Sequence, residues 1–310
     1  MRVGTSMLEV VGGTPVVQLG RVVPEGAADV FVKLEWFNPT GSYKDRMAAA
    51  MIEEAERRGT LRPGMSVVEY TAGSTGSSLA FVCAAKGYRL RIVSSDAFAP
   101  EKLATMAALG ADVTIVPSEG GKVTPDLVAR MIARAQEHAS EPDTYWTDQL
   151  NNRDSLLGYA AVGRELLAQL DRPIDVFCAA VGTAGLAMGV AGAFDEAGAG
   201  ARIVIFEPES TPVISGGEPG THTVEGIGIG FRPPLLDDDR YDEVRTVDEQ
   251  QGRAMARRLA AEEGLFAGTS TGLNVVGAVQ LAVELGPGGT VVTVACDTGL
   301  KYLSGDLHRA

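Results

Sequence analysis

The sequence predicts an α/β protein whose parallel sheets carry helices on both faces. Short runs rich in Val and Ile alternate along the chain with helical patterns, an order typical of parallel sheets. The 310 residues are 45% hydrophobic, enough to bury a large core in one bilobed unit or in two domains. No repeat or low-complexity segment interrupts the alternation. We therefore expect two strand-helix series that meet near residue 145.

The first series contains five predicted strands and four predicted helices. The strands are DVFVKLEW at 29–36, SVVEYT at 66–71, LRIVSS at 90–95, DVTIV at 112–116 and TYWTD at 144–148. The helices lie at 43–58, 77–87, 101–110 and 125–138. Ligands of open α/β sheets bind beyond the carboxyl ends of the strands, so the loops that follow these strands are the places to search for a site.

The second series resumes after a helix predicted at about 153–170. Its strands are DVFCAA at 175–180, RIVIFEP at 202–208 and TVVTVACD at 290–297. Its helices lie at 186–198, 248–262 and 272–284, and a glycine-rich loop covers 215–234.

Charge and hydropathy exclude several classes of function. The net charge is -13, so a nucleic acid or an anionic membrane surface would be bound against the overall field. The opening stretch lacks a long apolar run, and no later stretch is apolar over the length that a membrane span requires. We expect a cytoplasmic protein without nucleic-acid or membrane partners.

The sequence predicts no metal site. Cys83, Cys178 and Cys296 stand singly inside apolar runs, which favours buried thiols over disulfides or zinc ligands. The three histidines are scattered, without a second ligand at helical spacing.

A lysine follows a Gly-Ser turn in NPTGSYKDRMA, residues 38–48. We expect Ser42 to cap a helix, Asp45 to complete a capping box, and Lys44 to lie in the first helical turn. The positive end of the helix dipole would lower the pKa of Lys44, which suits a lysine that attacks a carbonyl. The alternative is a solvated lysine that begins a helix.

Two glycine-containing loops follow predicted strands and open helices. TAGSTG at 71–76 offers backbone N–H groups and the hydroxyls of Thr71, Ser74 and Thr75, and GTAGL at 182–186 offers Thr183 in the same way. Each loop alone could be a tight turn. Together with an activated lysine, two anion sites match a ligand with a phosphate, an aldehyde and an amino-acid carboxylate, which is pyridoxal phosphate (PLP) carrying an amino acid. Asp297 and Thr298, after the last strand, could face the pyridine nitrogen.

Eight motifs in order resemble one enzyme family over nearly the whole chain. They are NPTGSYKDR, TAGSTG, DQLNN, GTAGL, EPESTPVISGG, EGIGIGF, EEGLFAGTSTG and CDTGLKYLS. The sequence is similar to the cysteine synthase (O-acetylserine sulfhydrylase) and cystathionine β-synthase family of fold type II PLP enzymes. The resemblance implies a tryptophan synthase β-like fold of two three-layer αβα domains, with PLP in the cleft between them.

The resemblance also implies roles for individual residues. Lys44 would hold PLP covalently and act as the catalytic base. The other cofactor-binding residues would be Ser74, Gly182, Thr183, Ala184, Gly185, Leu186, Asp297 and Thr298. The substrate would be bound by Thr71, Ala72, Gly73, Thr75, Gln149, Gly226 and Gly228. The large domain would comprise 1–45 and 146–310, the small mobile domain 46–145, and the protein would be a homodimer.

The implied activity is β-replacement on an O-activated L-serine, O-acetylserine or O-phosphoserine. Sulfide or another thiol would be the nucleophile, and the product L-cysteine or a related β-substituted alanine. Arg232 could meet a phosphate leaving group, although an exposed loop arginine is the simpler interpretation.

The sequence departs from the family pattern at the ring and at the phosphate. Ser74 replaces an asparagine, Ala184 and Leu186 replace a glycine and a threonine, and Tyr43 replaces a small aliphatic residue. Asp297 would keep the pyridine protonated, which makes β-elimination, as in a cysteine desulfhydrase or a serine/threonine dehydratase, the alternative activity.

Three other classes of protein compete with this interpretation. GTSTG at 268–272 matches a nucleophile elbow, and Ser270, Asp297 and His308 follow in serine-hydrolase order, but no clear strand precedes the elbow. A nicotinamide-binding protein would need a G-x-G-x-x-G after a strand, and GIGIG has the wrong spacing. A non-catalytic, cofactor-binding regulator would not need to keep the lysine together with both loops.

Overall fold

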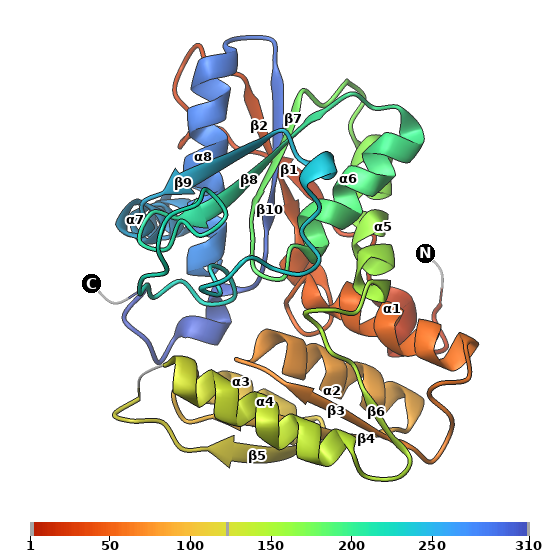
Figure 1. Ribbon diagram of the computed structural model, residues 1–310. Helices are drawn as coiled ribbons and strands as arrows, with labels where there is room; N and C mark the ends of the chain where they lie inside the picture. Colours follow the sequence, from red (N-terminus) through yellow and green to blue (C-terminus); the bar gives the residue numbers. More distant parts are fainter. Residues whose placement is uncertain (1–2, 122–123, 309–310) are drawn as a thin grey trace.

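The computed structural model describes residues 3–121 and 124–308 and contains two separate sheets (Figure 1). A six-stranded sheet has the order β1-β2-β10-β7-β8-β9, and a four-stranded sheet has the order β5-β4-β3-β6. All strand pairs are parallel except β1 with β2. The predicted α/β class is confirmed.

The six-stranded sheet combines residues from both ends of the chain. Its strands are β1 Val16–Gln18, β2 Asp29–Leu34, β7 Val176–Ala180, β8 Arg202–Pro208, β9 Glu243–Val247 and β10 Thr290–Ala295. Strands β1 and β9 were not predicted from the sequence. Both are edge strands, and β9 carries Glu243 and Arg245, so neither shows the apolar run of a strand buried on both faces.

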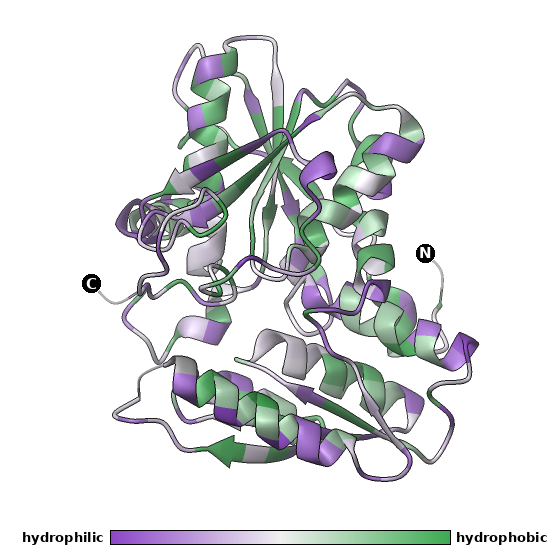
Figure 2. Cartoon of the chain, viewed as in Figure 1, coloured by the Kyte–Doolittle hydropathy of each residue, from purple (hydrophilic) through white to green (hydrophobic). Residues whose placement is uncertain are grey.

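Helices cover both faces of this sheet. On one face, α5 (Asp154–Gln169) and α6 (Gly185–Ala197) share a hydrophobic core with Phe177 of β7 and Ile205 of β8. On the other, α8 (Thr269–Leu285) packs with Cys178 and Phe206. Because successive side chains of a strand point to opposite faces, neighbouring residues serve different cores. Figure 2 shows the hydrophobic inner strands.

The four-stranded sheet has the same three layers. Its strands are β3 Ser66–Tyr70, β4 Arg89–Ser95, β5 Asp112–Val116 and β6 Thr144–Trp146. Helix α4 (Pro125–Ala139) packs on one face, and α2 (Ser74–Lys86) and α3 (Pro100–Ala108) lie on the other. Helix α1 (Lys44–Arg57) packs against both α2 and α5 and so joins the two parts of the molecule (Figure 1).

Most expected elements differ from the observed ones only at their ends. Helix α2 begins three residues earlier than predicted, and α8 begins at Thr269. The predicted helix 248–262 is α7 (Glu249–Arg258), which continues as a π-helical turn at Leu259–Glu263. The end of the first predicted strand is a 3₁₀ turn, Glu35–Phe37. Three further 3₁₀ turns occur at Met7–Val10, Asp238–Arg240 and Gly299–Tyr302.

The structure also bears on membrane-spanning helices, metal ligands and the state of the cysteines. In residues 3–121 and 124–308, no helix is long and apolar enough to cross a membrane. Within the same ranges, no three His, Cys, Asp or Glu side chains gather as metal ligands would. The three cysteines are free and buried, as predicted.

Candidate active site

Lys44 is the first residue of α1 and lies at the carboxyl end of β10. The N–H of Tyr43 donates to the carbonyl oxygen of Cys296 at 3.0 Å, and Ser42 forms a β-bridge with Asp297. These contacts hold the start of α1 against the end of the sheet. The Lys44 side chain is 6% exposed, and its Nζ lies 4.8 Å from the centre of the Tyr43 ring. The interpretation of Lys44 as a solvated residue is therefore wrong.

Burial lowers the pKa of Lys44 to about 8, against a smaller opposing effect of Cys296 and Glu69. The predicted lowering of the Lys44 pKa is confirmed, but its main cause is loss of hydration and not the helix dipole.

The predicted capping box at the start of α1 is wrong. The N-cap is Tyr43, and the Asp45 carboxylate accepts hydrogen bonds from the Thr40 N–H at 2.7 Å and the Thr40 hydroxyl at 2.6 Å. Ser42 still contributes to the turn before α1, because its hydroxyl accepts a hydrogen bond from the N–H of Lys44 at 3.3 Å.

The TAGSTG loop connects β3 to α2. Thr71 accepts a hydrogen bond from the N–H of Gly73, and the Thr75 hydroxyl donates to Gln149 Oε1 at 2.7 Å. Ala72 and Ser74 are half-buried in the same loop. The structure therefore brings together the expected substrate-binding residues that follow β3 and Gln149, which follows β6.

The GTAGL loop connects β7 to α6 and touches the EGIGIGF segment. A Cβ on Gly182 would lie 2.2 Å from the carbonyl oxygen of Gly226, and the N–H of Gly228 donates to Val181. Ala184 has a φ of 67°, a left-handed conformation that glycine adopts more easily. The loop therefore keeps its tight shape despite the Ala184 substitution, and the backbone N–H groups of Gly185 and Leu186 open helix α6.

Asp297 and Thr298 also lie at the carboxyl end of β10, beside the start of α8. The Asp297 Oδ2 atom accepts a hydrogen bond from the Tyr302 hydroxyl at 2.8 Å, whereas Oδ1 is buried, has no hydrogen-bond partner among the residues that the structure describes, and lies against Gly268. The Thr298 hydroxyl accepts from the N–H of Leu300. A buried carboxylate oxygen without a donor is an unfilled acceptor at this end of the sheet.

Sequence reasoning considered Ser270 only as a hydrolase nucleophile. In the structure Ser270 is buried at the start of α8, where the N–H of Gly268 donates to the carbonyl oxygen of Asp297 at 3.2 Å. The ring of His308 instead packs on Phe266, with 4.6 Å between the ring centres. Ser270 therefore belongs to the end of the site that holds Lys44. The position of Ser270 in the sequence did not indicate that it lies at the same end of the site as Lys44.

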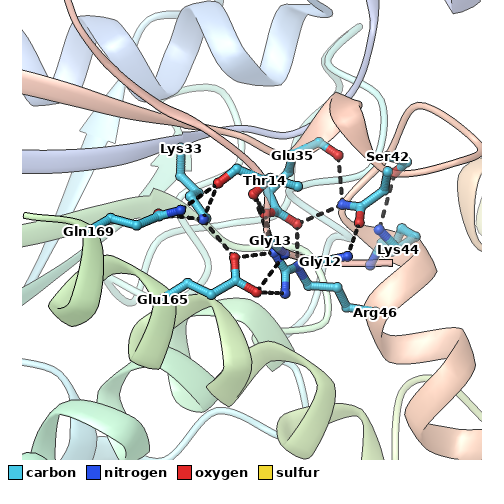
Figure 3. A network of polar contacts seen from close by, with 11 residues as sticks. Gly12, Gly13, Thr14, Lys33, Glu35, Ser42, Lys44, Arg46, Glu165 and Gln169 are labelled. Carbon is cyan, nitrogen blue, oxygen red and sulfur yellow. Dashed lines mark hydrogen bonds and ion pairs between the residues drawn. The ribbon is translucent and has the colours of Figure 1, made fainter. Parts of the chain in front are cut away.

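An ionic network behind Lys44 fixes the start of α1 (Figure 3). Glu165 of α5 lies between two cations: its Oε2 is 2.6 Å from Lys33 Nζ, and its Oε1 is 2.7 Å from Arg46 Nη1. Arg46 also pairs with Glu35 at 2.7 Å. Because Arg46 is two residues after Lys44, the network ties the lysine's helix to β2 and α5.

Two polar contacts join the four-stranded-sheet part to the other part near the same site. Lys102 of α3 forms an ion pair with Glu225, and its Nζ lies 4.6 Å from the centre of the Tyr302 ring. Its stem packs on Gly73, where a Cβ would meet Lys102 Cδ at 2.4 Å. The Glu101 carboxylate accepts from the Ser304 N–H at 2.7 Å. Sequence reasoning missed Lys102 because its partners lie far away in the chain.

Comparison with known proteins assigns this arrangement to a family. Residues 7–297 match the family model described as pyridoxal-phosphate dependent enzyme. The chain belongs to the family of pyridoxal-phosphate-dependent enzymes. A cysteine synthase of Staphylococcus aureus (strain Mu50 / ATCC 700699) is 42% identical over 98% of this chain and 96% of its own length.

Two solved structures share the fold of this PLP-dependent enzyme. A cysteine synthase from Entamoeba histolytica superposes with a TM-score of 0.91 at 31% identity, over 100% of this chain and 92% of the other. An O-ureido-L-serine synthase gives a TM-score of 0.90 at 35% identity, over 99% and 95%. The predicted family and the fold type II architecture are confirmed.

The residues present in this PLP-dependent enzyme fit the cofactor. The cofactor has an aldehyde, a phosphate and a ring nitrogen, and the site offers a different group for each. Lys44 has a lowered pKa, Gly182 leaves no room for a side chain in the loop at the start of α6, and Asp297 Oδ1 lacks a donor within the described part of the chain. Each of these features is costly or restrictive without a ligand, so together they match PLP.

Proposed function

We propose that this protein replaces the acetoxy group of O-acetyl-L-serine with sulfide, releasing L-cysteine and acetate. The observation that carries the proposal is the buried Lys44 amine, whose pKa of about 8 leaves part of it unprotonated at neutral pH. When bound, PLP supplies the electron sink that makes the Cα proton of an amino acid removable. The names of the cysteine synthase relatives support the choice of reaction.

Lys44 acts as the base in this proposal. Its Nζ takes the Cα proton as the free amine and later returns it. The N–H groups of GTAGL, residues 182–186, hold the cofactor phosphate, with Gly226 and Gly228 bordering the amino-acid pocket. Asp297 and Thr298 face the ring nitrogen.

The loop after β3 binds the substrate carboxylate. Thr71 and Thr75 act with Gln149, supported by the hydrogen bond that already joins Thr75 to Gln149. The first N–H groups of α2 favour an anion at this position. Ala72, Gly73 and Ser74 shape the loop.

We propose O-acetylserine rather than O-phosphoserine as the donor. Arg232, the cation closest in sequence to EGIGIGF, is 41% exposed and paired with Asp238. Its charge is thus already engaged by a carboxylate. A dianionic leaving group would need a cation that is available to it.

Residues 46–145 move as a small domain in this proposal, against 1–45 and 146–310. The contacts of Glu101 and Lys102 across the two parts support a closed position that excludes water from the reaction.

We also propose that the protein is a homodimer, for which the exposed Met7, Val10 and Phe37 offer apolar surface. We propose a cytoplasmic location, which the free cysteines favour. Light scattering on the purified protein tests the dimer.

The function is tested by mixing the PLP-loaded enzyme with sulfide and either donor, and measuring cysteine and keto acid. We expect sulfide-dependent cysteine from O-acetylserine, and none from Lys44→Ala. Accumulation of keto acid and ammonia without need for sulfide would instead establish β-elimination. A protein that takes up PLP but transforms neither donor would contradict both reactions.

A further inference from the structure

Glu69 is a buried carboxylate directly behind the loop proposed to bind the substrate carboxylate. It lies at the end of β3, is 0% exposed, and has no ion-pair partner among the residues that the structure describes. Burial raises its pKa to about 7. The charged and titratable groups near it are Lys44, Tyr70, Tyr145 and Asp148. A buried charge without a cation is costly, and a neutral side chain would avoid that cost.

Hydrogen bonds reach Glu69 on both carboxylate oxygens. Oε1 accepts from the N–H of Tyr70 at 2.9 Å, and Oε2 accepts from the Thr147 hydroxyl at 2.7 Å and the Gln149 N–H at 2.9 Å. Only a group that accepts on both oxygens satisfies this arrangement. A glutamine amide would turn its NH₂ toward one of the two backbone N–H groups, whichever way it was oriented.

The residue between these two partners has a strained backbone. Asp148 has a φ of 46°, one of three positive values among the non-glycine residues that the structure describes. Glu69 Oε2 holds Thr147 on one side of Asp148 and Gln149 on the other. Residues with a strained backbone persist where several surrounding contacts hold them in that conformation, and they cluster at functional sites.

We propose that Glu69 is a positioning residue that clamps the backbone around Asp148 and thereby sets the Gln149 side chain in the substrate-carboxylate site. This inference rests on the proposed function. From the clamped backbone, Gln149 Nε2 donates to the Tyr70 carbonyl at 3.0 Å, and Oε1 accepts from Thr75. The chain of contacts therefore runs from Glu69 through Gln149 to the loop at the start of α2.

The test compares Glu69→Gln with Glu207→Gln in the PLP-loaded enzyme. Glu207 is a matched control because it is 1% exposed, ends β8, and accepts N–H groups on both oxygens, from Ile214 and Ser215. We expect Glu69→Gln to raise the KM for O-acetylserine about tenfold, with kcat and the sulfide KM changed less than about twofold. Glu207→Gln should leave the donor KM within about twofold of wild type.

A donor without a carboxylate separates positioning from general damage. The carboxamide of O-acetylserine lacks the carboxylate that Gln149 is proposed to bind. The kcat/KM for this carboxamide should therefore be the same in Glu69→Gln as in wild type. An equal loss of kcat/KM for the acid and for the amide would overturn the inference.

Asp148→Gly provides a second variant, since glycine adopts the φ of 46° without strain. In that background the tenfold effect of Glu69→Gln should shrink, and an undiminished effect would contradict the clamp.

Failure of the proposed function has a different signature. If Thr75→Ala and Gln149→Ala leave the donor KM unchanged, the substrate site itself is wrongly placed. If these two variants raise the donor KM and Glu69→Gln does not, the site stands and the positioning role of Glu69 is wrong.

Discussion

The carbonyl oxygen of Gly226 occupies the space where a side chain on Gly182 would begin. A Cβ built on Gly182 lies 2.2 Å from that oxygen, so the loop after β7 and the EGIGIGF segment touch through their backbones. Two of the sequence motifs, more than forty residues apart, thus lie in backbone contact, as the proposed cofactor site requires.

Gly182→Ala should therefore weaken the binding of PLP. The added methyl group forces the two backbones apart, and overpacking of this kind costs about 1–3 kcal/mol, or about 5- to 150-fold in affinity. Titration of apo-protein with PLP, followed by absorbance, measures the effect. Gly20→Ala is the control, because a Cβ there meets no atom of residues 3–121 and 124–308 within 4 Å. Equal PLP affinity for both variants would show that the contact does not shape the cofactor site.

The rate at which apo-protein takes up PLP should rise with pH through about 8 and level off above about pH 9. Burial lowers the pKa of Lys44 to about 8, so about one amine in ten is free at pH 7, and nearly all are free at pH 9.5. An ordinary lysine would keep gaining free amine up to about pH 10.4. Stopped-flow absorbance on wild type, beside a free lysine derivative under the same conditions, separates the two cases. A rate that still climbs at pH 9.5 would contradict the lowered pKa.

Removing the charge of Glu165 should cost stability at neutral pH and little in acid. Burial alone would raise the pKa of Glu165, but Arg46 and Lys33 outweigh it and lower that pKa from 4.5 to about 2. A carboxylate with a lowered pKa stabilises the fold above pH 4.5, and this contribution disappears as the pH falls toward 2. Because 22% of the side chain is exposed, solvent screening leaves about 2 kcal/mol of the effect.

Urea unfolding of Glu165→Gln at pH 7 and pH 3 measures this difference. The variant should lose about 2 kcal/mol relative to wild type at pH 7 and less at pH 3. Glu262→Gln is the control, because Glu262 pairs with Arg258 on the surface and should change stability by less than about 0.5 kcal/mol. A loss of the same size at both pH values would mean that Glu165 acts through packing and not through its charge.

Lys102 and Glu225 should act together on the use of O-acetylserine. Their ion pair joins α3 to the segment before Gly226, and the Lys102 stem covers Gly73. Lys102→Met keeps the stem and removes the charge, and Glu225→Gln removes the other charge. In a double-variant cycle on kcat/KM we expect a coupling of about 1–3 kcal/mol. The surface pair Arg245 and Glu284 lies within the other part and should show no coupling. Additive effects at Lys102 and Glu225 would rule out a joint role.

The order of strands and helices could be predicted from the sequence because period and composition are local properties. The runs that became β7, β8 and β10 are buried almost throughout on both faces and are therefore mostly apolar. Edge strands β1 and β9 escaped prediction because solvent permits polar residues there. The loops with Lys44, Thr75 and Gly182 could also be found, since each follows a strand and opens a helix.

The sequence by itself determined the α/β class, the lysine and the two loops at helix starts. Only the tertiary structure decided which distant residues contact one another around the lysine and the two loops. Glu69 meets Gln149 across 80 residues, Lys102 meets Glu225 across 123, and Arg46 meets Glu165 across 119. The reason is physical: hydration, and with it the pKa of Lys44, depends on which distant segments exclude water. No local pattern of residues records which distant segments those are.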